Sequence, residues 1–314
     1  MTEPTILIYH RELADAYATE LRAHGLAGVD AVYNPEDASR LISECDILFG
    51  WKVPQGLLRG AKRLRWIQSM GAGVDDLVSR DDIPSDVAIT RIVGQFGEPI
   101  AEYVFSRLLY VFKDLGKSLE AQRKHVWAPV IEGTLAGKVI GIAGLGSIGC
   151  DVAALAKAFK MTVLGLSRSR VGGCTAVDEY YSPADWGKFA SKVDILVLTL
   201  PLTEETHHVI NGEVFKRMKT NSWIVNVGRG QLIDETALAE TLRLGEIGGA
   251  ILDVFESEPL PPTHPFWSHE NVIVTPHLSG PSRVESVTEF FVENLARFKS
   301  GDELLGLVNL KIGY

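Results

Sequence analysis

The chain has little cysteine, no excess of positive charge and no apolar run of the roughly 18 to 20 residues that span a bilayer. Its 314 residues carry 31 Lys and Arg against 40 Asp and Glu, which gives a formal net charge of -9. Binding to a nucleic-acid backbone or an anionic membrane surface depends on basic side chains that displace counterions. We therefore expect neither a nucleic acid nor a membrane as the main partner.

The three cysteines, Cys45, Cys150 and Cys174, have no metal-ligand spacing and cannot all pair with one another. The opening residues, MTEPTILIYH, lack the basic segment and the long apolar segment of a secretory signal. These absences favour a reducing, cytoplasmic location, and the sequence predicts no metal site.

What is present is the pattern of an α/β protein. The first hundred residues alternate short apolar runs with amphipathic stretches, which predicts parallel strands crossed by helices. A single long helix is expected over residues 98–117, with Pro99 in its first turn. A second series of six strands over residues 139–275 would make a full dinucleotide-binding sheet, and a final helix over 284–298 would stop at Gly301.

These elements predict two Rossmann-like or flavodoxin-like domains, each with a doubly wound parallel sheet. Because the last helix is interpreted as returning to the first domain, the cofactor domain would be inserted in the substrate domain. We place the substrate-binding domain at residues 1–100 and 285–314, and the dinucleotide-binding domain at residues 101–284.

The most informative motif is Gly144-x-Gly146-x-x-Gly149, between an apolar strand and an alanine-rich helix. In such a motif the first glycine permits the tight turn, the second lets the backbone approach a pyrophosphate, and the third lets helix and strand pack closely. Alone the motif is weak evidence, and a glycine-rich turn without a ligand is the alternative. Its context predicts a pyrophosphate site at Gly144, Leu145, Gly146, Ser147, Ile148 and Gly149.

The end of the next strand indicates which dinucleotide binds. An NAD site usually has an acidic residue about 20 positions after the glycine turn, to bind the ribose 2′-OH. Here the sequence is LSRSR, with Ser167, Arg168, Ser169 and Arg170. Hydroxyls and guanidiniums suit a 2′-phosphate, so we predict a preference for NADP(H), with NAD(H) as the second cofactor. A solvated basic loop is the alternative.

Three further motifs each follow a predicted strand, where open α/β sheets bind their ligands. They are NVGRG with Arg229, DVFESEPLP with Glu258, and VTPHLSG with His277. An imidazole can protonate the alkoxide left by hydride transfer, a carboxylate can orient that imidazole, and an arginine can bind a substrate carboxylate. We predict these roles for His277, Glu258 and Arg229, although each residue alone could be structural.

Together these residues resemble the D-isomer-specific 2-hydroxyacid dehydrogenase family, most closely its NADPH-preferring glyoxylate/hydroxypyruvate reductases. The likeness is carried by GLGSIG, LSRSR, LPLTEET, NVGRG, AILDVFESEPLP, HPFW, VIVTPHLSG and the terminal GY. It implies a homodimer that reduces small 2-oxo acids, such as glyoxylate or hydroxypyruvate, to D-2-hydroxy acids.

The resemblance also implies roles for single residues. It makes Arg229, Glu258 and His277 catalytic, and adds Arg229 and His277 to the substrate site. Backbone N–H groups of Ala72, Gly73 and Val74, in the segment MGAGVD, would hold the substrate carboxylate. Trp51 would face the substrate, and Trp127 is a further candidate for the pocket. The remaining implied cofactor contacts are Leu200, Pro201, Thr206, Val227, Gly228, Asp253, His277 and Gly280.

Two departures from the family pattern are visible. Gly228 stands where many relatives have Ala or Thr, which should loosen its loop slightly, and Glu98-Pro99 precede the long helix in place of apolar or small residues. Rival interpretations remain open. One is a family member acting on phosphoglycerate, phosphite or formate, and the other is a non-catalytic protein that senses NADP(H).

Overall fold

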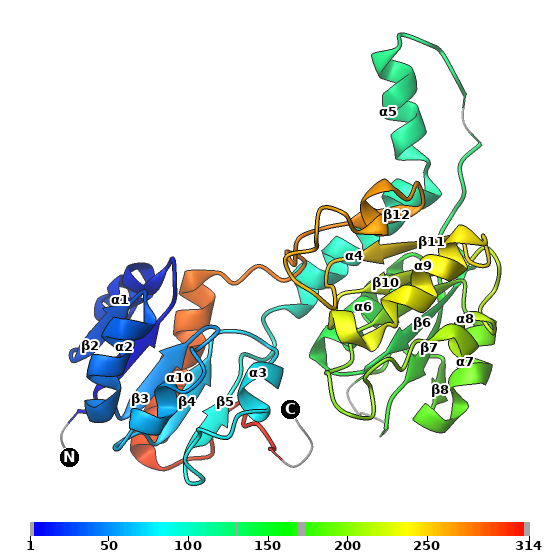
Figure 1. Cartoon of the computed structure of the whole chain (residues 1–314). Helices are drawn as coiled ribbons and strands as arrows, with labels where there is room; N and C mark the ends of the chain where they lie inside the picture. Colours follow the sequence, from blue (N-terminus) through cyan, green and yellow to red (C-terminus); the bar gives the residue numbers. More distant parts are fainter. Residues whose placement is uncertain (1–2, 130, 169–173, 311–314) are drawn as a thin grey trace. The chain divides into compact units, whose positions relative to one another are not determined.

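The structure is a computed structural model that describes residues 3–129, 131–168 and 174–310. The chain divides into two compact units (Figure 1). Unit 1 comprises Met1–Gln95 and Ser282–Tyr314, and unit 2 comprises Phe96–Pro281. Unit 2 is therefore an insertion, in sequence, between the two parts of unit 1.

Unit 1 is built on a five-stranded parallel sheet with the strand order β2-β1-β3-β4-β5. This order places a topological switch point between β1 and β3, as in flavodoxin-like folds. The strands are β1 (Ile6–Tyr9), β2 (Val29–Val32), β3 (Ile47–Gly50), β4 (Trp66–Ser69) and β5 (Ala88–Thr90). The helices are α1 (Ala14–Ala23), α2 (Pro35–Leu41), α3 (Asp75–Val78) and α10 (Val284–Ser300), with 3-10 turns η1 (Ile42–Glu44) and η2 (Leu57–Gly60).

Both faces of this sheet are covered, because successive strand residues point to opposite sides. On one face Phe49 and Trp66 stack on Phe291 of α10, with ring centroids 4.4 and 5.1 Å apart. The other face packs against α2, η1 and η2 through a cluster that includes Leu7, Leu48, Ile67, Ala38, Ile42 and Leu58. Helix α10 ends at Gly301, whose φ of 81° is the left-handed conformation of a helix stop.

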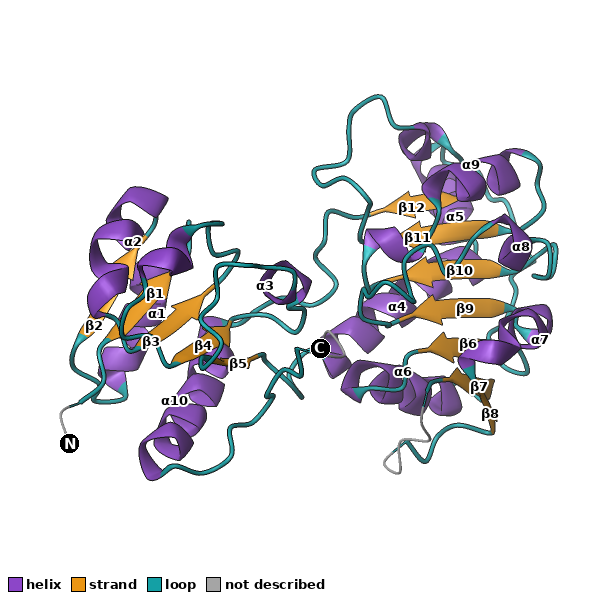
Figure 2. Ribbon diagram, turned by 60° about the horizontal axis from the view of Figure 1, so that its bottom comes forward, coloured by secondary structure: helices purple, strands orange, loops and turns teal. Residues whose placement is uncertain are grey.

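Unit 2 is built on a seven-stranded parallel sheet with the order β12-β11-β10-β9-β6-β7-β8, visible side by side in Figure 2. The strands are β6 (Val139–Ala143), β7 (Thr162–Leu166), β8 (Glu179–Tyr181), β9 (Ile195–Leu198), β10 (Trp223–Asn226), β11 (Gly249–Leu252) and β12 (Val272–Val274). The helices are α4 (Gly97–Phe112), α5 (Leu115–Arg123), α6 (Ser147–Ala158), α7 (Trp186–Lys192), α8 (Gly212–Phe215) and α9 (Glu235–Arg243), with 3-10 turns η3 (Pro183–Asp185), η4 (Gly230–Leu232) and η5 (Pro265–Ser268).

The switch point of this second sheet lies between β6 and β9, the position at which Rossmann folds bind dinucleotides. The prediction of two doubly wound parallel sheets is confirmed. The prediction of six strands in the second sheet is wrong by one, since β8 is an additional edge strand. It has only three residues, none of them buried, and so it lacks the apolar run that marks the other strands.

The single long helix expected over residues 98–117 is two helices. Helix α4 ends at Phe112, and Asp114 adopts the left-handed conformation, with φ of 47°, before α5 begins. Pro99 does lie in the first turn of α4, where a missing N–H leaves no hydrogen bond unmade. Helix α5 has no buried residue, and Figure 1 shows it projecting from the rest of unit 2. In the described part of the chain, no helix is long and apolar enough to span a membrane.

Candidate active site

The glycine turn connects β6 to α6. Gly144 has a φ of 101°, and a Cβ atom there would lie 2.8 Å from the carbonyl carbon of Thr199. A Cβ atom at Gly149 would collide with the carbonyl oxygen of Gly144. At Gly146 a Cβ atom would meet nothing within 4 Å, and no side chain caps the N-terminus of α6 there. Packing thus requires the outer two glycines, and the middle one leaves open space at a helix N-terminus, which fits a pyrophosphate.

Neighbouring groups hold this turn in place. Leu145 is 2% exposed, and Gly144 N–H donates to Leu166 O over 2.9 Å. The Thr199 hydroxyl donates to Gly144 O over 2.7 Å, which ties the turn to the strand across the switch point. Ser147 is exposed and Ile148 is half-buried at the start of α6. Sequence reasoning missed Thr199, although its place at the end of the strand after the switch point could have indicated it.

The residues after β7 include a cation. Arg168 is 45% exposed at its side chain and lies 3.5 Å from the Glu205 carboxylate, and Ser167 N–H donates to Tyr181 O over 3.1 Å. Ser169 and Arg170, the other two residues of the predicted 2′-phosphate loop, lie outside the described residues. The described part of the loop presents one guanidinium and one hydroxyl at the end of the second strand of the dinucleotide fold.

Two of the three predicted catalytic residues form a hydrogen-bonded pair. His277 Nδ1 and Glu258 Oε2 are 2.8 Å apart, with 42% and 30% of their side chains exposed. Glu258 Oε1 accepts a hydrogen bond from Phe255 N–H over 3.2 Å. Because the carboxylate engages Nδ1, the other ring nitrogen, Nε2, remains available for a proton transfer. Within the described residues Nε2 has no hydrogen-bond partner.

The loop that carries His277 is held by Asp253, which is completely buried after β11. Asp253 Oδ1 accepts from Thr275 Oγ1 over 2.6 Å and from Leu278 N–H over 3.0 Å, and Oδ2 accepts from Ser279 N–H over 2.8 Å. His277 itself has φ of 52°, and its N–H donates to Asp253 O. A network of this density fixes the position of the imidazole. The contact of Asp253 with a nicotinamide stays a prediction.

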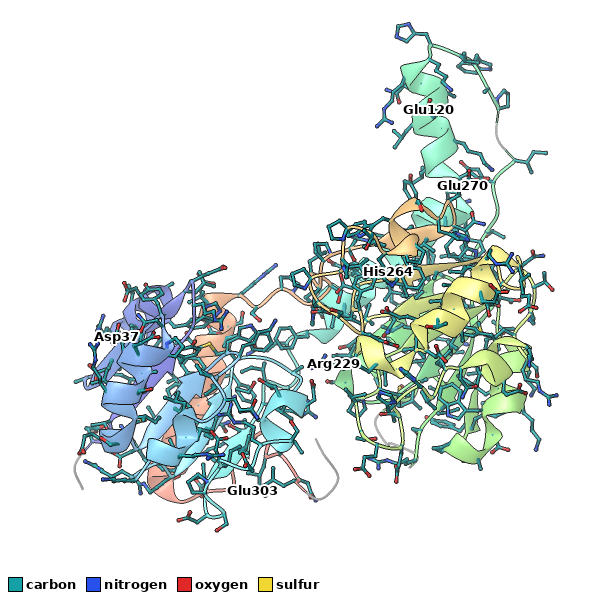
Figure 3. The ribbon with its side chains drawn as sticks, in the orientation of Figure 1. Asp37, Glu120, Arg229, His264, Glu270 and Glu303 are labelled. Atoms are coloured by element: carbon teal, nitrogen blue, oxygen red, sulfur yellow. The ribbon has the colours of Figure 1, made fainter. Side chains whose placement is uncertain are left out.

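Arg229 follows β10, in the loop labelled in Figure 3. Its Nη1 donates to Gly228 O over 2.8 Å, and Asn226 Nδ2 donates to Arg229 O over 2.8 Å. A Cβ atom at Gly230 would collide with the backbone of Phe255, three residues before Glu258. The loops of Arg229 and Glu258 therefore pack backbone against backbone. Sequence reasoning missed Asn226 and Gly230, which occupy the two ends of the NVGRG motif.

The expectation that Gly228 loosens its loop stays a prediction, and the structure shows close contacts around this glycine. A Cβ atom there would lie 2.9 Å from Leu232 Cδ1 and 3.0 Å from Leu200 O, so the glycine fills a closely packed position. The neighbouring Val227 is 8% exposed. On the loop after β9, Thr206 Oγ1 donates to Pro201 O over 2.8 Å and so closes the segment.

Gly280, the remaining predicted cofactor contact, packs against α4, since a Cβ atom there would lie 3.1 Å from Ile100 Cδ1. Elsewhere in unit 2, Trp127 is 95% exposed after α5. Across residues 3–129, 131–168 and 174–310, no group of His, Cys, Asp and Glu could hold a metal ion.

Unit 1 contains the predicted substrate loop after β4. The Trp51 ring covers Gly71, where a Cβ atom would collide with the indole. Gly71 N–H donates to Ser69 Oγ, whereas the N–H groups of Ala72, Gly73 and Val74 have no partner among the described residues. Unit 1 thus brings together the predicted Trp51 and the loop, and unit 2 brings together the predicted catalytic loops.

A dinucleotide turn and a histidine–carboxylate pair on one sheet are features of a nicotinamide-dependent dehydrogenase. Comparison with known proteins agrees. The profile of the D-isomer specific 2-hydroxyacid dehydrogenase NAD binding domain matches residues 105–279, which is more than half of the chain. The chain belongs to the D-isomer-specific 2-hydroxyacid dehydrogenase family, as the sequence resemblance implied, and is an NAD(P)-dependent oxidoreductase.

Individual relatives are similar over most of their length. Glyoxylate/hydroxypyruvate reductase A of Yersinia enterocolitica is 30% identical over 278 residues, which cover 86% of this chain and 88% of that protein. The structure of the NADPH-dependent glyoxylate/hydroxypyruvate reductase of Sinorhizobium meliloti, with NADP and sulfate, has a TM-score of 0.90 at 30% identity, and the match covers 99% of this chain and 100% of that one. The D-isomer specific 2-hydroxyacid dehydrogenase of Xanthobacter autotrophicus, with NADPH and MES, has a TM-score of 0.88 at 31% identity over 100% of both chains.

Proposed function

We propose that this protein reduces small 2-oxo acids to D-2-hydroxy acids with NADPH, and that glyoxylate and hydroxypyruvate are its first candidate substrates. The observation that carries this proposal is the 2.8 Å pair of His277 and Glu258, on the same sheet as the glycine turn of Gly144 to Gly149. The family and the activities of the relatives from Yersinia and Sinorhizobium support it.

The chemistry follows from what each side chain can do. Bound NADPH would supply the hydride to the carbonyl carbon. His277 donates its proton to the carbonyl oxygen and accepts it again in the reverse reaction. Glu258 stabilises the protonated imidazole and fixes its orientation. Arg229 binds the substrate carboxylate and polarises the adjacent carbonyl group.

The preference for NADPH rests on the residues after β7. Arg168 offers a guanidinium for a 2′-phosphate, and no carboxylate occurs among residues 167–170 to repel it. The relatives from Sinorhizobium and Xanthobacter bind NADP or NADPH, which supports the same choice. We assign dinucleotide binding to unit 2 and substrate binding to unit 1, whose loop of Ala72 to Val74 would hold the carboxylate through its N–H groups.

A steady-state screen of 2-oxo acids against NADPH and NADH tests the proposal. We expect the highest kcat/KM with glyoxylate or hydroxypyruvate, and a higher kcat/KM with NADPH than with NADH. Turnover confined to phosphoglycerate, phosphite or formate would replace the proposed substrates. Tight NADPH binding with no turnover of any 2-oxo acid would favour the non-catalytic NADP(H)-sensing protein.

We further propose a homodimer formed through α5 and the segment that follows it. Apolar side chains on this projecting part of unit 2 are exposed, and solvent-exposed apolar patches mark interaction surfaces. They are Leu115, Leu119, Val126, Trp127 and Ile131, with exposed fractions between 42% and 99%, and Tyr110 near the end of α4 is also exposed, at 43%.

Light scattering tests this assignment. Leu119→Glu together with Trp127→Ser should produce monomers, because a charge and a lost aromatic ring disrupt an apolar contact. Leu244→Glu, at a residue that is 53% exposed at the end of α9, is the matched control and should leave the mass unchanged. A wild-type monomer would contradict the proposal. A cytoplasmic location and the lack of a nucleic-acid partner stay predictions from the sequence.

A further inference from the structure

Arg91 is a half-buried cation without an anionic partner. It is the first residue after β5, and its Nη1 donates a single hydrogen bond, over 3.3 Å, to Ala72 O. Among the described residues no carboxylate lies within ion-pair distance of its guanidinium. Burial lowers the pKa of Arg91 from its ordinary value, and no neighbouring charge acts in the opposite direction. An arginine in this state retains uncommitted N–H donors and an uncompensated charge.

The topology of unit 1 places Arg91 with the predicted substrate residues. Strands β3, β4 and β5 are adjacent and parallel, so their carboxyl ends share one edge of the sheet. Trp51 follows β3, the loop of Ala72 to Val74 follows β4 and Arg91 follows β5. Three consecutive strands therefore supply an aromatic ring, a row of amide N–H groups and a guanidinium to the edge where open α/β sheets bind ligands.

The backbone of Arg91 is firmly anchored. Its N–H donates to Gly306 O over 3.0 Å, and Gly306 has φ of 68°, with its α-carbon so close that a Cβ atom would collide with Arg91 O. Leu305, beside this glycine, is held by Asn294, which donates to Leu305 O over 2.9 Å and accepts from Leu305 N–H over 2.8 Å. The segment around Leu305 and Gly306 thus fixes the backbone of Arg91.

The amide N–H groups and the guanidinium at this edge of the sheet can both bind one anion. Val74 is 2% exposed, yet its N–H has no hydrogen-bond partner within the described residues, and the same holds for the N–H groups of Ala72 and Gly73. A buried donor without an acceptor costs free energy, and so does a buried cation without an anion. A small carboxylate satisfies both, because it accepts several hydrogen bonds and carries the opposite charge.

We propose that Arg91 is a further substrate-binding residue, the cation in unit 1 that attracts and holds the carboxylate of the 2-oxo acid beside the Ala72–Val74 amides. The inference rests on the proposed function and adds a charged side chain to the part of the site in unit 1, where the groups assigned so far are the Trp51 ring and the Ala72–Val74 amides.

Three variants separate the charge of Arg91 from its hydrogen bond. Arg91→Met removes both, Arg91→Gln keeps a donor for Ala72 O without the charge, and Arg91→Lys keeps the charge without the planar fork. Arg59→Met is the matched control, because Arg59 is an exposed arginine of the same unit that pairs with Asp81 at 3.2 Å. Thermal unfolding of each variant establishes that it is folded.

Two measurements are made on the folded variants with saturating NADP(H). The first is the KM and kcat for glyoxylate. The second is the calorimetric Kd of oxalate, a small carboxylate that accepts no hydride. We expect Arg91→Met and Arg91→Gln to raise both the KM and the Kd by about 10- to 100-fold, with kcat changed less than about threefold. Arg91→Lys should fall between these variants and the wild type, and Arg59→Met should match the wild type.

Unchanged values in Arg91→Met would overturn the inference. Wild-type values in Arg91→Gln would also overturn it, because the role would then be to hold the loop through Ala72 O. The oxalate measurement separates this outcome from failure of the proposed function. If the protein turns over no 2-oxo acid but binds oxalate in a manner that depends on Arg91, the proposed reaction is refuted and the proposed anion site is retained.

Discussion

The two units present their site groups in opposite electrostatic states. In unit 2 the ionisable groups already have partners, since Glu258 binds His277 and the Asp253 carboxylate accepts three hydrogen bonds. In unit 1 the groups are donors instead: among the described residues the Ala72–Val74 amides have no acceptor, and the Arg91 guanidinium has Ala72 O as an acceptor but no anionic partner. If the proposed function holds, the site groups of unit 2 are in place before the substrate binds, and the donors of unit 1 gain their acceptor from the substrate.

This difference has a kinetic consequence. Groups that are fixed before binding, and that act on developing charge, stabilise the transition state, whereas groups that bind a carboxylate act on ground state and transition state alike. Substitutions in the catalytic loops of unit 2 should therefore lower kcat. Substitutions at the substrate edge of unit 1 should mainly raise KM.

The largest effect is expected for His277→Ala. Loss of a general acid typically costs about 10²- to 10⁴-fold in rate, so kcat for glyoxylate should fall by that factor. NADPH binding, measured by fluorescence titration, should change little. His24→Ala is the control, at the residue of unit 1 that directly follows α1, where His24 Nε2 lies 3.7 Å from Glu20 Oε1. A kcat close to that of the wild type would refute the assignment of acid and base, and with it the contrast between the units.

The second effect concerns the stability of unit 1. Arg80 and Asp82 form a buried ion pair of 2.6 Å, with 4% and 0% of their side chains exposed, and Arg80 also donates to Val53 O and Pro54 O. Removing one charge of a buried pair typically costs about 3 to 5 kcal/mol. Asp82→Asn should therefore lower the Tm of the unit 1 transition in calorimetry. The exposed neighbour gives the control, since Asp81→Asn should cost little.

The same variant has a predicted pH dependence. Hydrogen bonds from Arg80 lower the pKa of the Asp82 carboxyl. A depressed folded-state pKa contributes stability that is complete above the ordinary carboxyl pKa of about 4 and is lost as the pH falls through the folded value. The Tm of Asp82→Asn should therefore lie furthest below that of the wild type at pH 7. The difference should become smaller as the pH falls below about 4. A constant difference would show that shape, and not charge, explains the defect.

A smaller effect is expected at Glu235, whose carboxylate binds the backbone of the loop that carries Glu258. Glu235 Oε1 accepts from Glu256 N–H over 2.8 Å, two residues before Glu258, and burial raises the pKa of Glu235. Since the folded pKa is raised, the ionised form is penalised, and stability is lost as the pH rises through that pKa. Glu235→Gln keeps the acceptor and should retain kcat, whereas Glu235→Ala should lower kcat about 5- to 10-fold by releasing the loop.

Stability measured against pH, together with kcat, distinguishes a positioning role of Glu235 from a merely structural one. Glu235→Gln should also be more stable than the wild type above the raised pKa, because the penalty on the charged form is absent. Equal kcat values in the Ala and Gln variants would remove Glu235 from the positioning of Glu258.

Local patterns predicted the parts of the site that depend on neighbours in sequence. The glycine turn was visible because its three glycines serve one turn, and Arg229, Glu258 and His277 each stand in a short motif after an apolar strand. Other features depend on tertiary context. Strand β8 pairs with β7 without an apolar run of its own, and the helix break at Asp114 has no proline and no glycine within it. Arg91 lies between the apolar Ile89 and Ile92, so the sequence pattern does not set it apart, and only the structure shows that β5 ends at Thr90, just before it.

The smallest effect is expected for Gly228→Ala, in the loop before Arg229. The added Cβ would lie 2.9 Å from the flexible end of the Leu232 side chain, which can move, but also 3.0 Å from Leu200 O. Overpacking of this degree costs about 1 kcal/mol, partly offset by the reduced freedom of the unfolded chain. Tm should fall by about 2 °C with kcat unchanged, while Gly212→Ala, where a Cβ meets nothing within 4 Å, serves as control. A large loss of kcat would mean that the position of Arg229 depends on that close packing, so the catalytic loops of unit 2 would be less rigidly preorganised than the contrast with unit 1 requires.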